Sequence, residues 1–146
     1  MKYIRLLASL SVLFAAALFS GCSVIQLTAD VSPGTNLGEA KKFYVVHAPK
    51  DDRGIDRLIA DRLNLMGKQA SYGDKSGIPA EVDAIVTYQD KWMWDMTMYM
   101  IELNIQLRRP KTEMSMASGH SLRTSLARKS PPQMVEEVLT AIFSKK

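Results

Sequence analysis

The chain has 146 residues, 47% of them hydrophobic, and a formal net charge of +4 at pH 7. That length fits one domain with its own hydrophobic core. The single cysteine excludes an intramolecular disulfide framework, and so small a charge gives little support to nucleic-acid binding.

The first 21 residues have the three parts of a secretory signal peptide. The segment from Met1 to Arg5 is basic, residues 6–19 are mostly apolar, and Ser20 and Gly21 are small. The apolar run of about 14 residues is shorter than the roughly 20 that a membrane-spanning helix needs. We therefore predict a cleaved signal peptide over residues 1–21, and its removal lowers the formal charge to +2.

The residues around the predicted cleavage point carry a family resemblance. The run Phe19-Ser20-Gly21-Cys22 resembles the lipobox of bacterial lipoprotein precursors, with Phe19 where that family usually has leucine. The resemblance implies cleavage between Gly21 and Cys22, a diacylglyceryl group on the Cys22 sulfur, and acylation of the new amine. Several acyl chains would anchor the protein stably, since each buried methylene contributes about 0.8 kcal/mol. In that family an aspartate after the cysteine favours the inner membrane, so Ser23 implies the periplasmic face of the outer membrane.

The segment after the cysteine is predicted to be a tether. Residues 22–41 form this lipidated N-terminus and tether, because Ser32 to Asn36 is a turn-forming stretch with Pro33 and Gly34. A periplasmic domain is expected over residues 42–146.

The domain is predicted to open with a strand and a helix. Phe43 to His47 is β-branched and aromatic, which favours a strand. Asp51 and Asp52 are suited to the start of a helix, where carboxylates interact with free N–H groups. Apolar residues then recur at helical spacing from Ile55 to Met66, and Gly67 ends the helix.

The middle of the chain has the two-residue alternation of half-buried strands. A short strand is predicted at 69–72, and the alternation then runs from 83 to 107, far beyond the usual 3–10 residues of a strand. We therefore place a reversal at 94–97, although no glycine, proline or asparagine marks it. A clearer turn at 109–112 leads into a further strand at about 114–125.

A second helix is predicted at the end of the chain. Ser130 and Gln133 form a capping box around two prolines, and an apolar stripe runs from Met134 to Phe143. The order β-α-(β)-β-β-β-α predicts an α+β two-layer sandwich. Its sheet would be antiparallel or mixed, with four to five strands and both helices on one face.

Together with the lipobox, this order resembles small outer-membrane lipoproteins of Gram-negative bacteria whose function is uncharacterised. The resemblance rests on Asp83 to Tyr88, Trp92 to Met96, and Ser118 to Ser121. The layout is also similar to the periplasmic domains of the curli-secretion lipoprotein and of lipoprotein activators of penicillin-binding proteins. These are partner-binding modules, so the resemblance implies a non-enzyme that binds an envelope protein. The mature charge of +2 argues against a nucleic-acid partner, and we expect no cofactor beyond the lipid on Cys22.

One segment suggests a binding surface. Trp92 and Trp94 lie two residues apart, and Arg108 and Arg109 come later in the same alternating region. Tryptophan and arginine are enriched at protein interfaces, so these four residues are a candidate partner surface. Solvated strands also carry such charges without any partner.

The alternative prediction is a soft-metal site. Met96, Met98, Met114 and Met116 would lie on neighbouring strands, with His120 nearby, and thioether sulfur suits Cu(I). The simpler interpretation is that these methionines fill gaps in the core.

Overall fold

The computed structural model describes residues 23–145. The predicted signal peptide, the cleavage point after Gly21 and the lipidation residue Cys22 lie outside this range and stay predictions. The bounds of the helices and strands are β1 Ile25–Val31, β2 Lys42–Val46, α2 Ile55–Leu65, β3 Gln69–Gly73, η1 Lys75–Gly77, β4 Ala84–Asp95, β5 Thr97–Arg108, β6 Ser115–Arg123, η2 Ser125–Ala127 and α3 Pro131–Ser144.

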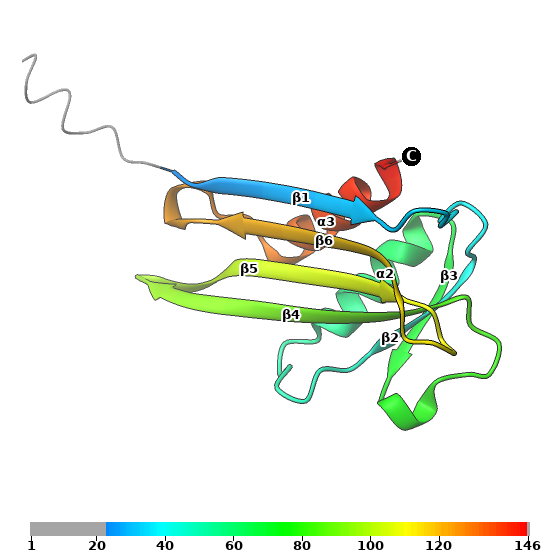
Figure 1. Cartoon of the computed structure of the whole chain (residues 1–146). Coiled ribbons are helices and arrows are strands. Elements are labelled where there is room, and N and C mark those ends of the chain that lie inside the picture. Colours follow the sequence, from blue (N-terminus) through cyan, green and yellow to red (C-terminus); the bar gives the residue numbers. More distant parts are fainter. Residues whose placement is uncertain (1–22, 146) are drawn as a thin grey trace, which may run out of the picture.

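The strands form one mixed sheet with the order β1-β6-β5-β4-β2-β3 (Figure 1). Neighbouring strands among the first four in this order are antiparallel, whereas β2 pairs in parallel with both β3 and β4. Both α-helices lie on the same face of the sheet. The predicted α+β class is therefore confirmed, with six strands where we expected four to five.

The additional strand, β1, falls inside the segment predicted to be a tether. Residues 25–31 pair along their whole length with β6, from Ile25 opposite Arg123 to Val31 opposite Ala117. The prediction of a tether over 22–41 is thus wrong for this stretch, which is an edge strand of the domain. The signal was present, because Ile25, Leu27, Ala29 and Val31 alternate with polar residues.

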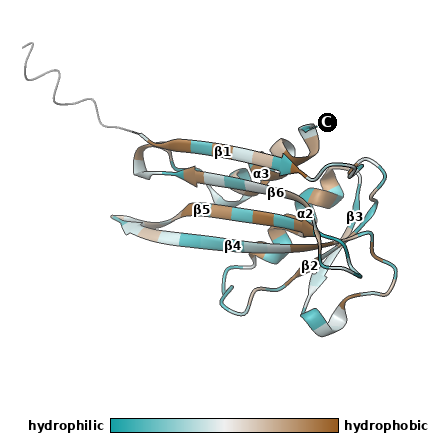
Figure 2. Cartoon of the chain, in the orientation of Figure 1, coloured by the Kyte–Doolittle hydropathy of each residue, from teal (hydrophilic) through white to brown (hydrophobic). Residues whose placement is uncertain are grey.

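The core lies between the sheet and the two helices. Figure 2 shows hydrophobic and hydrophilic segments alternating along β1 and β5, as expected for strands with one buried face. Gly119 of β6 brings α3 close to the sheet, since a Cβ atom there would lie 2.7 Å from Cγ1 of Val138 and 2.8 Å from Cγ1 of Ile142.

A buried carboxylate ties α3 to β6. Glu137 accepts hydrogen bonds from Ser121 Oγ (2.5 Å), from Arg123 Nε (2.9 Å) and from Lys129 Nζ (2.5 Å). The Glu137 side chain is only 9% exposed. The N-terminus of α3 is the predicted capping box of Ser130 and Gln133, and the backbone N–H of Ser130 donates to Gln133 Oε1 at 3.0 Å.

Candidate functional site

The β4–β5 hairpin ends in an exposed group of apolar side chains. The predicted reversal is confirmed, since β4 ends at Asp95 and β5 begins at Thr97, leaving Met96 alone in the turn. We call residues 93–98 the hairpin tip. The exposed fraction reaches 69% for Trp94 and 88% for Met96, and Met93 and Met98 are exposed as well.

The two tryptophans have different surroundings. Trp92 is half-buried, its Nε1 donates to the Asp90 carboxylate, and the Arg53 guanidinium stacks 4.4 Å from its ring centre. Trp94 lies across from Met98 at the tip and is exposed. Only Trp94 therefore offers its ring to a partner.

Two other segments reach the same end of the sheet as the hairpin tip. The backbone N–H of Val24, just before β1, donates to Thr124 Oγ1 at 3.0 Å. The next residue, Ser125, donates its hydroxyl to the Asp95 carboxylate. Exposed Leu126 follows in η2. This end of the molecule thus gathers apolar side chains from β1, η2 and the β4–β5 hairpin.

The charges at the hairpin tip are paired. Arg128 Nη2 lies 3.7 Å from the Asp95 carboxylate, and Arg128 Nη1 donates to Thr97 Oγ1 at 2.8 Å. The same guanidinium stacks 4.8 Å from the centre of the Tyr99 ring. The tip therefore presents little net charge.

The predicted partner surface is not one surface. Trp94 lies at the hairpin tip, but Arg108 pairs with Ile85 at the opposite end of β4 and β5. Arg109 continues into the β5–β6 turn at that far end, where its N–H donates to the Met114 carbonyl. The two arginines therefore cannot share a contact patch with Trp94, because about ten residues of strand at about 3.4 Å each separate them.

The structure also separates the predicted metal ligands. Met96 and Met98 are at the hairpin tip, whereas Met114 and Met116 adjoin the β5–β6 turn at the far end. His120 lies between the two groups, with Nε2 3.2 Å from Glu102 Oε1. The five residues form no common coordination site.

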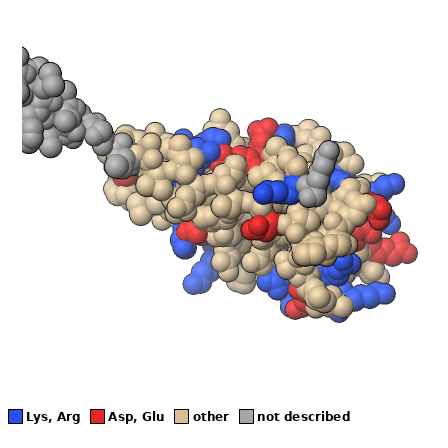
Figure 3. Space-filling view, turned by 45° about the horizontal axis from the view of Figure 1, so that its top comes forward, with Lys and Arg blue, Asp and Glu red and all other residues tan. Residues whose placement is uncertain are grey.

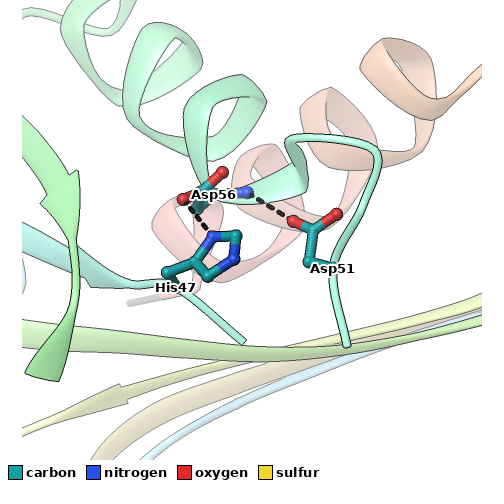
Figure 4. A group of neighbouring side chains, drawn as sticks. All are labelled: His47, Asp51 and Asp56. Atoms are coloured by element: carbon teal, nitrogen blue, oxygen red, sulfur yellow. Dashed lines mark hydrogen bonds and ion pairs between the residues drawn. The ribbon is translucent and has the colours of Figure 1, made fainter. Parts of the chain in front are cut away.

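A cluster that the sequence analysis did not single out joins His47, Asp51 and Asp56 (Figure 4). His47 Nδ1 lies 2.8 Å from Asp56 Oδ2. Asp51 accepts from the N–H groups of Arg53, Gly54, Ile55 and Asp56 and from the Tyr88 hydroxyl at 2.6 Å. The prediction of an acidic residue at the start of the first helix is confirmed. The N-cap residue of α2 is Gly54, and the Asp51 carboxylate, three residues earlier, accepts hydrogen bonds from the free N–H groups of the first turn.

The pKa values in this cluster agree with a structural role. The hydrogen bond with Asp56 raises the pKa of His47 above 6.5. Partial burial alone would raise the pKa of Asp51, but the hydrogen bonds from Tyr88 and from backbone N–H groups outweigh it and lower that pKa. Burial and the hydrogen bond to Asp51 raise the pKa of Tyr88. Because the Asp51 oxygens already accept five hydrogen bonds, the cluster is explained by helix capping without a metal ion.

No helix within residues 23–145 is long and apolar enough to cross a membrane. The site residues named from the sequence include Trp94, Met96 and Met98 but not Met93, Ile25 and Leu126, which complete the apolar end. Once β1 is paired with β6, the ladder places Ile25 beside Arg123 and the start of η2.

Comparisons with known proteins give the fold alone. No protein-family model matches the sequence, and no curated protein matches it. Among solved structures, a PelC dodecamer from Paraburkholderia phytofirmans is similar, with a TM-score of 0.58, 11% identity, and coverage of 82% of this chain and 98% of that chain. A variant PelC dodecamer from the same organism gives a TM-score of 0.56 at 11% identity, covering 83% of this chain and 95% of that one. At this identity, the chain shares the fold of PelC over nearly all of the described domain.

Proposed function

We propose that this chain is a lipid-anchored protein on the periplasmic face of the outer membrane, acting as a non-catalytic accessory module that binds another envelope protein. The observation that carries the proposal is the lipobox ending in Cys22, followed almost at once by strand β1 at Ile25. A folded domain that begins this close to the lipobox cysteine is suited to work at the membrane surface.

The open face of the sheet is the surface proposed to bind the partner. Both α-helices cover the other face, and the open face has a shallow polar hollow. Its lining includes Thr87 and Gln89 of β4 and Asn104, Gln106 and Arg108 of β5. Arg108 donates to Gln106 Oε1 at 2.6 Å, so its planar guanidinium is held in place. Amide and guanidinium groups in this arrangement favour a protein partner recognised by hydrogen bonds.

A second copy of this chain is one partner to consider. The similar PelC structures are dodecamers, which supports testing self-association first. In that case the partner contact would join two identical chains, and the lipid anchors of both would lie in one membrane.

Two experiments test the proposal. The first labels cells with a palmitate analogue and fractionates their membranes, comparing the wild type with Cys22→Ser. We expect label in the outer-membrane fraction that the substitution abolishes, and an unlabelled wild type would refute lipid anchoring.

The second experiment places a photocrosslinking residue at Gln89 or Gln106 on the open face, with Asp61 on α2 as the matched exposed control. We expect a defined crosslinked species from the open-face positions and none from Asp61. Equal crosslinking from both faces would refute the assignment of the partner surface.

A further inference from the structure

We propose that the hairpin tip enters the lipid leaflet that holds the acyl chains of Cys22, as a second membrane contact of the same domain. This inference rests on the proposed lipid anchor. The exposed apolar side chains of the tip would thus be surrounded by the headgroup and upper acyl region of a phospholipid leaflet.

The hairpin projects beyond the rest of the sheet. The ladder between β5 and β6 extends only to the pair Glu102 and Leu122, so residues 97–101 of β5 have β4 as their only sheet neighbour. At about 3.4 Å per residue, this overhang is roughly 15 Å long. Tyr99 and Met100 are buried at the base of this overhang, whereas Trp94, Met96 and Met98 at its end are exposed.

The backbone of the tip gives a second, independent observation. Met96 has a φ of 57°, in the left-handed region where glycine or asparagine is ordinarily found. A methionine there strains the backbone while its side chain, 88% exposed, gains almost no packing within the domain. A strained and exposed apolar residue fits a role in binding rather than in folding.

The described part of the chain begins at the same end of the molecule. Val24 is hydrogen-bonded to Thr124, beside the segment that contacts Asp95, and Cys22 precedes Val24 by two residues. Consecutive Cα atoms are about 3.8 Å apart, so the two Cα–Cα steps from Val24 to the predicted lipidation residue can span at most about 8 Å. Three strand spacings of about 4.8 Å separate β1 from β4, so the anchor and the tip are near enough to meet one leaflet.

Charge favours lipid over a polar partner at this end. Asp95 is paired with Arg128, which leaves the tip nearly neutral. Figure 3 shows that, in that view, residues without charge cover most of the left end, beside the larger group of grey atoms, whereas charged side chains gather toward the right end. Tryptophan is favoured at membrane–water interfaces, where its ring is buried and its N–H stays hydrated.

The two tryptophans make the test selective. The lipidated mature protein is reconstituted in vesicles of phosphatidylethanolamine and phosphatidylglycerol, with or without lipids brominated high on the acyl chain. Trp92→Phe leaves Trp94 as the only tryptophan, and Trp94→Phe leaves the half-buried Trp92 as the matched control. We expect brominated lipid to remove most of the Trp94 emission and to leave the Trp92 emission nearly unchanged.

The outcomes distinguish the proposed lipid anchor on Cys22 from the proposed insertion of the hairpin tip into the leaflet. If mass spectrometry finds no diacylglyceryl group on Cys22, the lipid anchor and this inference both fail. If the protein is lipidated and floats with vesicles but Trp94 is not quenched, only the inference fails. A blue-shifted but unquenched Trp94 would overturn it too, because protein rather than lipid would then cover the tip. Circular dichroism of both variants must match the wild type.

Discussion

Acid should weaken this domain, and Glu137 should contribute a large part of the effect. Burial alone would raise its pKa, but hydrogen bonds from Arg123, Lys129 and Ser121 outweigh that cost and lower the pKa from 4.5 to about 2. A carboxylate with a depressed pKa in the folded state stabilises the protein above its unfolded pKa. That contribution is lost as the pH falls toward the folded value.

The shift in the pKa of Glu137 sets the size of the change in the free energy of unfolding. A difference of about 2.5 pKa units at about 1.4 kcal/mol per unit gives roughly 3 kcal/mol, present above about pH 5 and lost by about pH 2. This is a large share of the free energy of unfolding of a typical domain, which is roughly 5–15 kcal/mol. Glu137→Gln keeps the shape of the side chain but cannot ionise, so the variant should lack this part of the pH dependence.

Urea unfolding from pH 7 to pH 2 measures the effect on the unlipidated chain carrying Cys22→Ser. Asp51, Asp83 and Glu102 also have lowered pKa values, so the wild type alone would not isolate Glu137. The comparison with Glu137→Gln does, since both proteins share those groups. We expect the variant to be less stable at pH 7 and the two profiles to converge toward pH 2. Parallel profiles would refute the reasoning.

Three further predictions concern packing, capping and metal binding. Gly119→Ala should lower the free energy of unfolding by about 1–3 kcal/mol, because the new Cβ would lie 2.7 Å from Cγ1 of Val138. Adding Val138→Ala to the same chain removes that contact and should recover part of the lost stability. Asp51→Ala should lower the free energy of unfolding by about 1–2 kcal/mol, because the substitution removes the carboxylate that caps α2. The control is Asp52→Ala at the exposed neighbouring residue, which should change the free energy of unfolding by less than about 0.5 kcal/mol. Titration with Cu(I) should give no sub-micromolar binding, because the tip methionines and those near the β5–β6 turn lie at opposite ends of the sheet; tight binding by the folded chain would contradict this.

Periodicity predicted most of the fold because burial on one face leaves a local signal. The alternation from 83 to 107 and the apolar stripes of both helices lie within single elements or adjoining ones. The reversal near Met96 followed from strand length, although no glycine, proline or asparagine marks the turn. The missed strand, β1, has the same alternation but was assigned to a tether, and its Ile25 and Leu27 remain exposed at the edge of the sheet.

The site was harder to predict because it depends on pairing between strands. Leu107 pairs with Ala117 and Glu102 with Leu122, so each step away from the β5–β6 turn on one strand matches a step on the other. Met98 therefore lies far from Met114, although both are near turns in the sequence. Counting residues outward from the turn at 109–112 is enough to separate the two methionines, because Met98 lies eleven positions before the turn and Met114 only two after it.

The same counting divides the β4–β5 hairpin into two ends with different chemistry. Trp94 and its apolar neighbours lie at the end where the chain comes from Cys22, and Arg108 lies at the other, beside the polar hollow of the open face. With the lipid anchor and the tip both in the leaflet, two separate contacts would fix the sheet relative to the membrane where one acylated residue would leave it free to rotate. The open face would then stand at a fixed angle to the membrane, with Arg108 directed toward the periplasm. A partner would meet the face in one orientation, and disrupting the tip should weaken that partner's crosslinking at Gln106 without removing the lipid anchor.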